Sequence, residues 1–136
     1  EPAQSEVAPS LGADELGTSD VQVRRRRHIV DGRPVMLSIS YYPDSIAAGS
    51  QIVEAFTGPG GSPARLDELG YGPARHRVRF QSRLPSEDER EKLELPPGST
   101  VSRSVRVSRD REGRAVEVTE MIAAGDAFIH EFDIPS

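Results

Sequence analysis

A chain of 136 residues without cysteine is long enough for one domain with a single hydrophobic core, and it has neither a disulfide framework nor a thiolate metal site. Its formal net charge of −5 disfavours nucleic-acid binding through bulk electrostatics, because neutralising phosphates requires a basic surface. No apolar run approaches the ~20 residues of a membrane span, and the first residues do not resemble a signal peptide, so we expect a soluble, cytoplasmic domain with no membrane partner.

The first residues are rich in Pro, Ser and Glu. We interpret residues 1–8 as a mobile N-terminal segment or part of a strand, and residues 9–136 as the domain itself. A short helix is expected over Leu11–Leu16, and Gly17 is a typical helix-terminating residue.

Two strand-like stretches follow, and they contain the densest charge in the chain. Val21–Val30 and Val35–Tyr42 both alternate apolar and polar residues over much of their length, the period of two that is typical of strands with one buried face. Asp31 and Gly32 lie between them and tolerate the positive φ of a tight turn. The sequence therefore predicts a β-hairpin.

Residues 57–63 form a glycine-proline loop after this hairpin. The loop lacks the GxxxxGK[ST] pattern of phosphate-binding loops, so we interpret it as a connection to a helix over Ala64–Leu69. Ser62 as the N-cap, Pro63 at the first helical position and Gly70 past the last turn favour that helix.

The second half of the chain predicts four strands and one helix. Arg75–Arg83 alternates as a strand, and the helix over Ser86–Leu93 has an acidic first turn that suits the helix dipole. Val101–Arg109 and Ala115–Ile122 predict a second hairpin. Ala127–Ile134 alternates again and is predicted to be the last strand.

The two halves repeat each other. Val21–Arg26 corresponds to Val101–Arg106, and residues 31–35 correspond to residues 112–116. Each half contributes a helix and a hairpin, which predicts an α+β fold in which an antiparallel sheet carries helices on one face, built from two pseudo-repeats. The repeat also predicts a strand before Pro9, since Arg75–Arg83 precedes the equivalent helix.

Four signatures occur in order along the chain: VRRRxxxxDGRPVxLxxSYxP, TGPGGxxARLxELG, RxPSxxE and a final GRxVEV. Together they resemble the UTRA domain of GntR-type transcriptional regulators of the HutC-like subgroup, from about Ala8 to Phe132. The resemblance implies a chorismate-lyase-like fold, a pocket for a small-molecule effector and a homodimer. It also implies an N-terminal winged-helix DNA-binding domain, which is absent from this chain. We expect DNA to be bound only through that domain.

The resemblance implies which residues bind the effector. Arg26 and His28 fall where members carry a pair that binds acidic or phosphorylated effectors. The second residue of the pair is usually arginine, so His28 predicts weaker or pH-dependent binding. Ser38 falls where some members carry a glutamate, Arg83 is the arginine of RxPSxxE, and Glu117 is the glutamate of GRxVEV. We expect a small polar or anionic metabolite and no cofactor, metal or catalytic residue.

Each site residue also has a structural alternative. Arg26 on a strand can form an exposed ion pair of little energetic value, Arg83 can satisfy groups at the neighbouring helix, and Glu117 can pair with an arginine on the adjacent strand. Two other functions are also open: an enzyme on the chorismate-lyase fold, and a dimerisation module with a vestigial pocket. We expect a sensor rather than an enzyme, because the sequence shows no pair of catalytic groups with opposed pKa environments.

Overall fold

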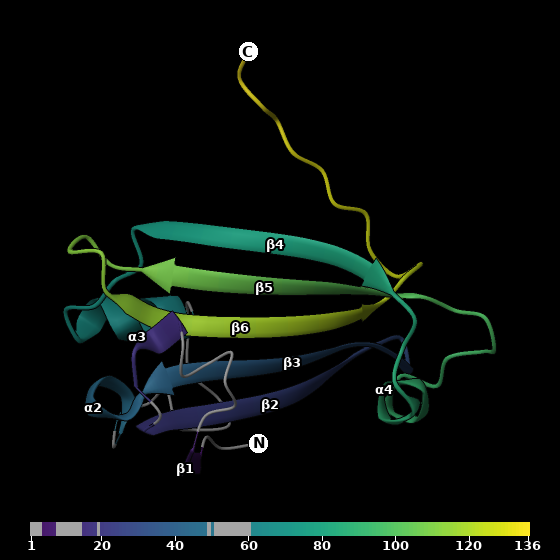
Figure 1. The fold of residues 1–136 in the computed structure, drawn as a ribbon, viewed down its shortest axis with the longest axis horizontal. Coiled ribbons are helices and arrows are strands. Elements are labelled where there is room, and N and C mark those ends of the chain that lie inside the picture. Colours follow the sequence, from purple (N-terminus) through teal and green to yellow (C-terminus); the bar gives the residue numbers. More distant parts are fainter. Residues whose placement is uncertain (1–3, 8–14, 19, 49, 51–60) are drawn as a thin grey trace.

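The computed structural model describes residues 4–7, 15–18, 20–48, 50 and 61–136. Its strands form one antiparallel sheet of six strands in the order β1-β2-β3-β6-β5-β4 (Figure 1). The strands are β1 (Gln4–Val7), β2 (Asp20–Val30), β3 (Arg33–Pro43), β4 (Arg75–Arg83), β5 (Val101–Arg109) and β6 (Ala115–Ala124). The helices with described bounds are α2 (Asp44–Ala47), α3 (Gly61–Glu68) and α4 (Glu87–Lys92). The predicted α+β class with an antiparallel sheet is confirmed.

Most predicted strands are confirmed, including β1, which only the repeat between the two halves had predicted. The predicted strand over Ala127–Ile134 is wrong. Residues 125–136, which we call the C-terminal tail, form a turn and then irregular chain. Alternation alone does not make a strand, because a strand also needs a partner for its backbone groups, and the sheet ends at β4.

The sheet order reflects the sequence repeat. Strands β1-β2-β3 form one half and β4-β5-β6 the other, and the two halves meet where β3 pairs with β6. Each long hairpin has a register shift at the same place in the repeat, between His28 and Ile29 in one half and between Ser108 and Arg109 in the other. The two halves therefore share both topology and local distortion.

Helix α4 begins as predicted. The Ser86 hydroxyl accepts a hydrogen bond from the Glu89 backbone N–H at 3.2 Å, and the Glu89 carboxylate accepts one from the Ser86 backbone N–H at 2.9 Å. This reciprocal capping box satisfies two backbone donors at the start of the helix. The acidic residues of the first turn also face the positive end of the helix dipole.

Helix α3 begins at Gly61, earlier than predicted, so Ser62 lies inside its first turn and is not the N-cap. Gly70 follows the helix with a φ of +86°, as its predicted role in ending the helix requires. Residues 57–60 of the glycine-proline loop lie outside the described residues. Most of the predicted helix over Leu11–Leu16 does too.

Three groups of buried side chains hold the fold together. The largest lies on the sheet and contains Val21, Val23, Tyr41, Val105, Val107 and Val118. A second places Leu93, at the end of α4, on Val101 and Ile122. The third joins α2 and α3 through Tyr42, Ala47, Leu66 and Val116. Figure 1 shows α2 and α3 at one end of the sheet and α4 at the other.

Within the described part of the chain, no helix is both long enough and apolar enough to cross a membrane.

Candidate functional site

Polar side chains from four neighbouring strands lie on one face of the sheet. Strand alternation and the observed register bring them together: Arg26 lies opposite Ser38, Ser40 opposite Thr119, and Thr119 opposite Arg106. We call this surface the polar face and define it by Arg24, Arg26, His28, Ser38, Ser40, Ser104, Arg106, Ser108, Glu117 and Thr119.

Hydrogen bonds join the strands across the polar face. His28 Nε2 lies 3.0 Å from Ser38 Oγ, and Ser40 Oγ lies 2.9 Å from Thr119 Oγ1. Further across the sheet, the Arg106 guanidinium donates to the Glu117 carboxylate at 2.8 Å. These side chains therefore form a connected surface over β2, β3, β6 and β5.

Much of the polar face is buried, including charged groups. Arg24 is 6% exposed and Glu117 is 1% exposed, and Ser104, Ser108 and Thr119 are also buried. Burying polar and charged groups is costly unless they are paired, so a sheet face of this composition is an unusual core. Convergent polar groups in a shielded position are typical of a ligand site.

The positive charges at the β2 end of the polar face affect one another. Burial, and then the nearby charge of Arg24, lower the pKa of Arg26 from its usual value, although a guanidinium keeps its proton in proteins. Burial and then the charge of Arg26 lower the pKa of His28. His28 is therefore mainly neutral at neutral pH, and the arginines supply the positive charge.

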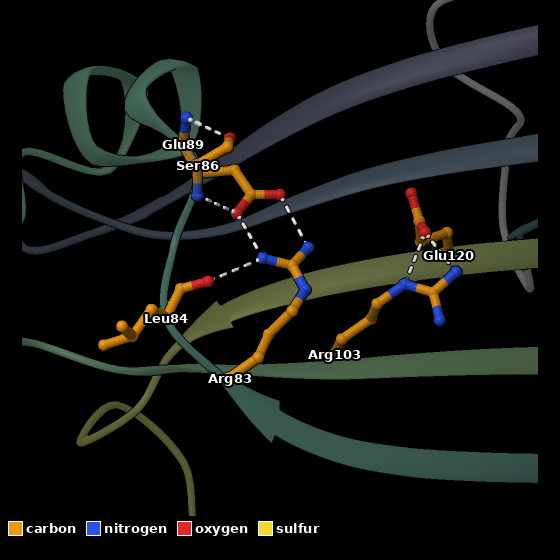
Figure 2. A network of polar contacts seen from close by, with 6 residues as sticks. All are labelled: Arg83, Leu84, Ser86, Glu89, Arg103 and Glu120. Carbon is orange, nitrogen blue, oxygen red and sulfur yellow. Dashed lines mark hydrogen bonds and ion pairs between the residues drawn. The ribbon is translucent and has the colours of Figure 1, made fainter.

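Arg83 does not lie with the other predicted site residues. It is opposite Val101, whose side chain packs with Leu93 and Ile122 beneath α4, on the face of the sheet away from Arg26. Figure 2 shows its guanidinium holding both oxygens of Glu89, at 2.7 and 2.9 Å, and also donating to the Leu84 carbonyl at 3.0 Å.

This arrangement gives Arg83 a structural role. The Arg83 hydrogen bond is the largest influence on the pKa of Glu89 and lowers it despite partial burial, so Glu89 is a carboxylate that both caps α4 and accepts from β4. Beside it, Arg103 pairs with Glu120 at 2.7 Å (Figure 2). The geometry thus supports the structural alternative for Arg83 rather than its predicted place at the effector.

Glu117 lies on the polar face, but some distance along the strands from Arg26. It is opposite Ser108, whereas the row that contains Arg26 reaches β6 at Met121. Four residues of strand correspond to roughly 13 Å. The structure brings together Arg26, His28 and Ser38 as neighbours, and Glu117 marks the other end of the polar face.

The sequence prediction missed six members of the polar face: Arg24, Ser40, Ser104, Arg106, Ser108 and Thr119. Alternation was the available signal for two of them, because Arg24 shares a strand face with Arg26 and Ser40 with Ser38. To assign the residues of β5 and β6 to this face, one must know how these strands pair with β3, and sequence alternation does not show that register.

A groove of about 720 Å³ borders this region, within the size range of small-molecule sites. It extends between the β2–β3 hairpin and α4. Strand β1 pairs only with Asp20–Val23, so the rest of β2 is an edge of the sheet. The groove lies at this edge and therefore reaches side chains of both sheet faces. Its lining includes Arg26, His28 and Ser38, together with Arg25, Arg27, Ser86, Asp88, Glu89, Lys92 and Glu120.

The groove and the polar face overlap without coinciding. Near α4 the groove carries charges of both signs, whereas the buried residues Arg24, Thr119 and Glu117 do not line it. We favour the polar face as the centre of the site, because desolvated charges interact more strongly than exposed ones. No cluster suited to holding a metal ion occurs in the described residues.

Comparisons with known proteins agree with this fold. The UTRA domain family matches residues 1–129. An HTH-type transcriptional regulator of Streptomyces coelicolor is 31% identical over 134 residues, covering 96% of this chain and 49% of that protein. One of Rhizobium meliloti is 29% identical over 133 residues, covering 92% of this chain and 50% of that protein. The chain thus spans about half the length of these relatives.

Solved structures that share the fold include two regulator domains. A GntR-family transcriptional regulator from Bacillus cereus superposes with a TM-score of 0.83 at 21% identity, over 99% of this chain and 95% of that one. The effector domain of PhnF from Mycobacterium smegmatis gives a TM-score of 0.77 at 22% identity, over 95% of this chain and 83% of that one. On the family match over nearly its whole length, the chain belongs to the UTRA domain family.

Proposed function

We propose that this chain is the effector-binding and dimerising domain of a bacterial transcriptional regulator, and that its effector is a small polar or anionic metabolite. The observation that carries the proposal is the partly buried polar face, whose described members include three arginines and a single carboxylate. Such an excess of positive charge in a shielded position favours a negatively charged ligand. Arginine suits this role because its planar fork binds a carboxylate or phosphate with two hydrogen bonds.

Within this proposal, Arg26 and Arg24 hold the anion and Ser38 and Ser40 position its polar groups. The two hydroxyls lie on β3 directly opposite the two arginines, Ser38 opposite Arg26 and Ser40 opposite Arg24. His28 adjoins Ser38 and adjusts the affinity. Arg83 is left out of this set because it lies on the other face and is held by Glu89.

DNA binding belongs in this proposal to a winged-helix domain outside this chain. The curated relatives are named HTH-type regulators, and the chain spans about half their length. An effector bound on the polar face would act on DNA through the geometry of a dimer, which would set the spacing of two such DNA-binding domains.

A thermal-shift screen with carboxylic acids and phosphate esters tests the proposal. A ligand at a hundred times its dissociation constant stabilises the folded state by about 2.7 kcal/mol, which corresponds to roughly 5–10 °C in a domain of this size. Arg26→Ala should lose most of the shift. The matched control is Arg83→Ala, which should melt lower than the parent and still respond fully to the ligand. Equal ligand shifts in the parent and in Arg26→Ala would contradict the assignment of the polar face.

A further inference from the structure

The run of four arginines on β2 supplies cations to both faces of the sheet. Two of them belong to the polar face, so strand alternation turns the other two, Arg25 and Arg27, to the opposite face. The observed register places Arg25 opposite Ile39 and Arg27 opposite Leu37 on β3. The proposed effector site uses only the first pair of arginines, which leaves the second pair without an assigned role.

Apolar side chains line the groove on this opposite face. Leu37 and Ile39 on β3 line it together with Ile122 on β6, which lies opposite Leu37, and we call these three residues the apolar floor. Leu37 packs against the buried group beneath α4, and Ile39 packs against the largest buried group. Although β3 is a central strand, both side chains are partly exposed. The floor therefore favours a ligand with an apolar body, because binding removes this surface from water.

The acidic side chains of the groove are matched by cations. Three of the described residues that line the groove are carboxylates, and each forms an ion pair: Glu89 with Arg83, Glu120 with Arg103, and Asp88 with Lys92. Figure 2 shows the first two of these pairs. The positive charge that the groove offers to a ligand therefore comes from the β2 side.

Arg27 keeps most of its hydrogen-bond donors available. It is exposed and donates one long hydrogen bond, of 3.4 Å, to the Lys92 carbonyl at the end of α4. A guanidinium has five N–H donors, and this partner is a neutral group, so the cation can still bind a carboxylate. Its planar fork suits a carboxylate, because it offers two parallel hydrogen bonds. Since Arg27 lies beside the apolar floor, one small ligand can contact both.

We propose that the groove contains a second ligand site, on the sheet face away from the polar face, and that this site takes a small carboxylic acid with an apolar body. Arg27 binds the carboxylate, Arg25 adds positive charge, and the apolar body lies on the apolar floor. The two sites select different acids, because hydroxyls surround the arginines of the polar face whereas aliphatic side chains adjoin Arg27. The inference goes beyond the proposed function, which assigns a ligand to the polar face alone.

Titration calorimetry with octanoate tests this site. Acetate has the carboxylate without the apolar body, and octanol has the apolar body without the charge. Octanoate should bind the parent at least about tenfold more tightly than either compound, because each of them lacks one of the two contacts. No binding of octanoate, or equal binding of acetate, would overturn the proposal.

Methyl NMR spectra separate the two faces of the sheet. The methyl signals of the apolar floor should shift on addition of octanoate. The two methionines report on the other face, because Met36 alternates with Ser38 and Met121 lies opposite Ser38. Their signals should stay in place with octanoate and move with an effector bound on the polar face. Octanoate that moved the methionine signals and left the floor unchanged would overturn the second site and leave the proposed function intact.

A pair of matched substitutions tests the role of the cation. Arg27→Gln should weaken octanoate binding about tenfold or more, because it removes a charge-assisted pair of hydrogen bonds. The control is Arg79→Gln, an exposed arginine of β4 that does not line the groove. It should bind octanoate as the parent does, and circular dichroism checks that both variants are folded. Equal affinity in Arg27→Gln and the parent would overturn the assignment of the carboxylate to this arginine.

Discussion

The two halves of the sheet place an arginine at the same position and surround it differently. By the sequence repeat, Arg26 on β2 corresponds to Arg106 on β5, and each lies two residues before a register shift. Arg106 pairs diagonally across the strands with Glu117 at 2.8 Å. The residue equivalent to Glu117 in the first half is Met36, which is uncharged.

The two halves of the repeat differ in the charges that surround this arginine. In the second half an arginine and a buried glutamate neutralise each other and join β5 to β6. In the first half the carboxylate is replaced by methionine, while Arg24 adds a second positive charge on the same face. In the proposed function the second half supplies rigidity and the first half supplies the anion site.

The largest effect is expected from breaking the pair in the second half. Arg106→Met removes the guanidinium from a carboxylate that is 1% exposed, and should cost about 3 kcal/mol of unfolding free energy. The matched change Arg26→Met should cost under about 1 kcal/mol, because it relieves the repulsion between Arg24 and Arg26. Urea denaturation of both variants measures the difference. If Arg26→Met lowered the unfolding free energy as much as Arg106→Met, the two arginines would not differ in their contribution to stability.

The sequence predicted the two hairpins and their repeat, but not the structure of the C-terminal tail. Alternation and turn residues are local signals, so both hairpins and the repeat were predicted, and the positive φ of Asp31 and Gly32 agrees with the predicted turn. The C-terminal tail has the same alternation as a strand and forms none in the single chain. A strand also needs a partner for its backbone groups, and alternation within the segment does not show whether one is present.

The sequence also showed only in part which of the proposed site residues lie close together. Alternation shows which residues of one strand share a face, but it does not show which faces of distant strands coincide. Arg26, His28 and Ser38 lie close together, because one hairpin joins them. Arg83 was grouped with them although β4 lies at the far edge of the sheet and turns this residue toward α4. The order of the strands in the sheet decides whether Arg83 lies near Arg26, and that order is set by the packing of the whole chain.

A smaller effect is expected from making the first half resemble the second. Met36→Glu places a carboxylate at the position equivalent to Glu117, opposite His28 and diagonal to Arg26. The added negative charge should weaken binding of an anionic effector about tenfold, since one charge at this range changes the binding energy by roughly 1–3 kcal/mol. Met36→Gln is the uncharged control of the same size. Titration calorimetry with a ligand found in the screen compares them, and equal affinities would argue against an anion near Arg26.

The smallest effect concerns His28, whose equivalent in the second half is Ser108. Burial and the charge of Arg26 lower the pKa of His28, so below about pH 6.5 the unfolded chain binds a proton that the folded chain resists. Stability should therefore fall as the pH drops from 6.5 through the pKa of the folded state, by at most about 1.4 kcal/mol per pH unit for one proton. His28→Ser copies the second half and should flatten this part of the curve. His76 and His130 remain in both proteins, so the difference between their urea midpoints, measured from pH 7.5 to 5, isolates His28. Parallel curves would mean that His28 takes up its proton equally in both states, and that the first half does not resist protonation at this position.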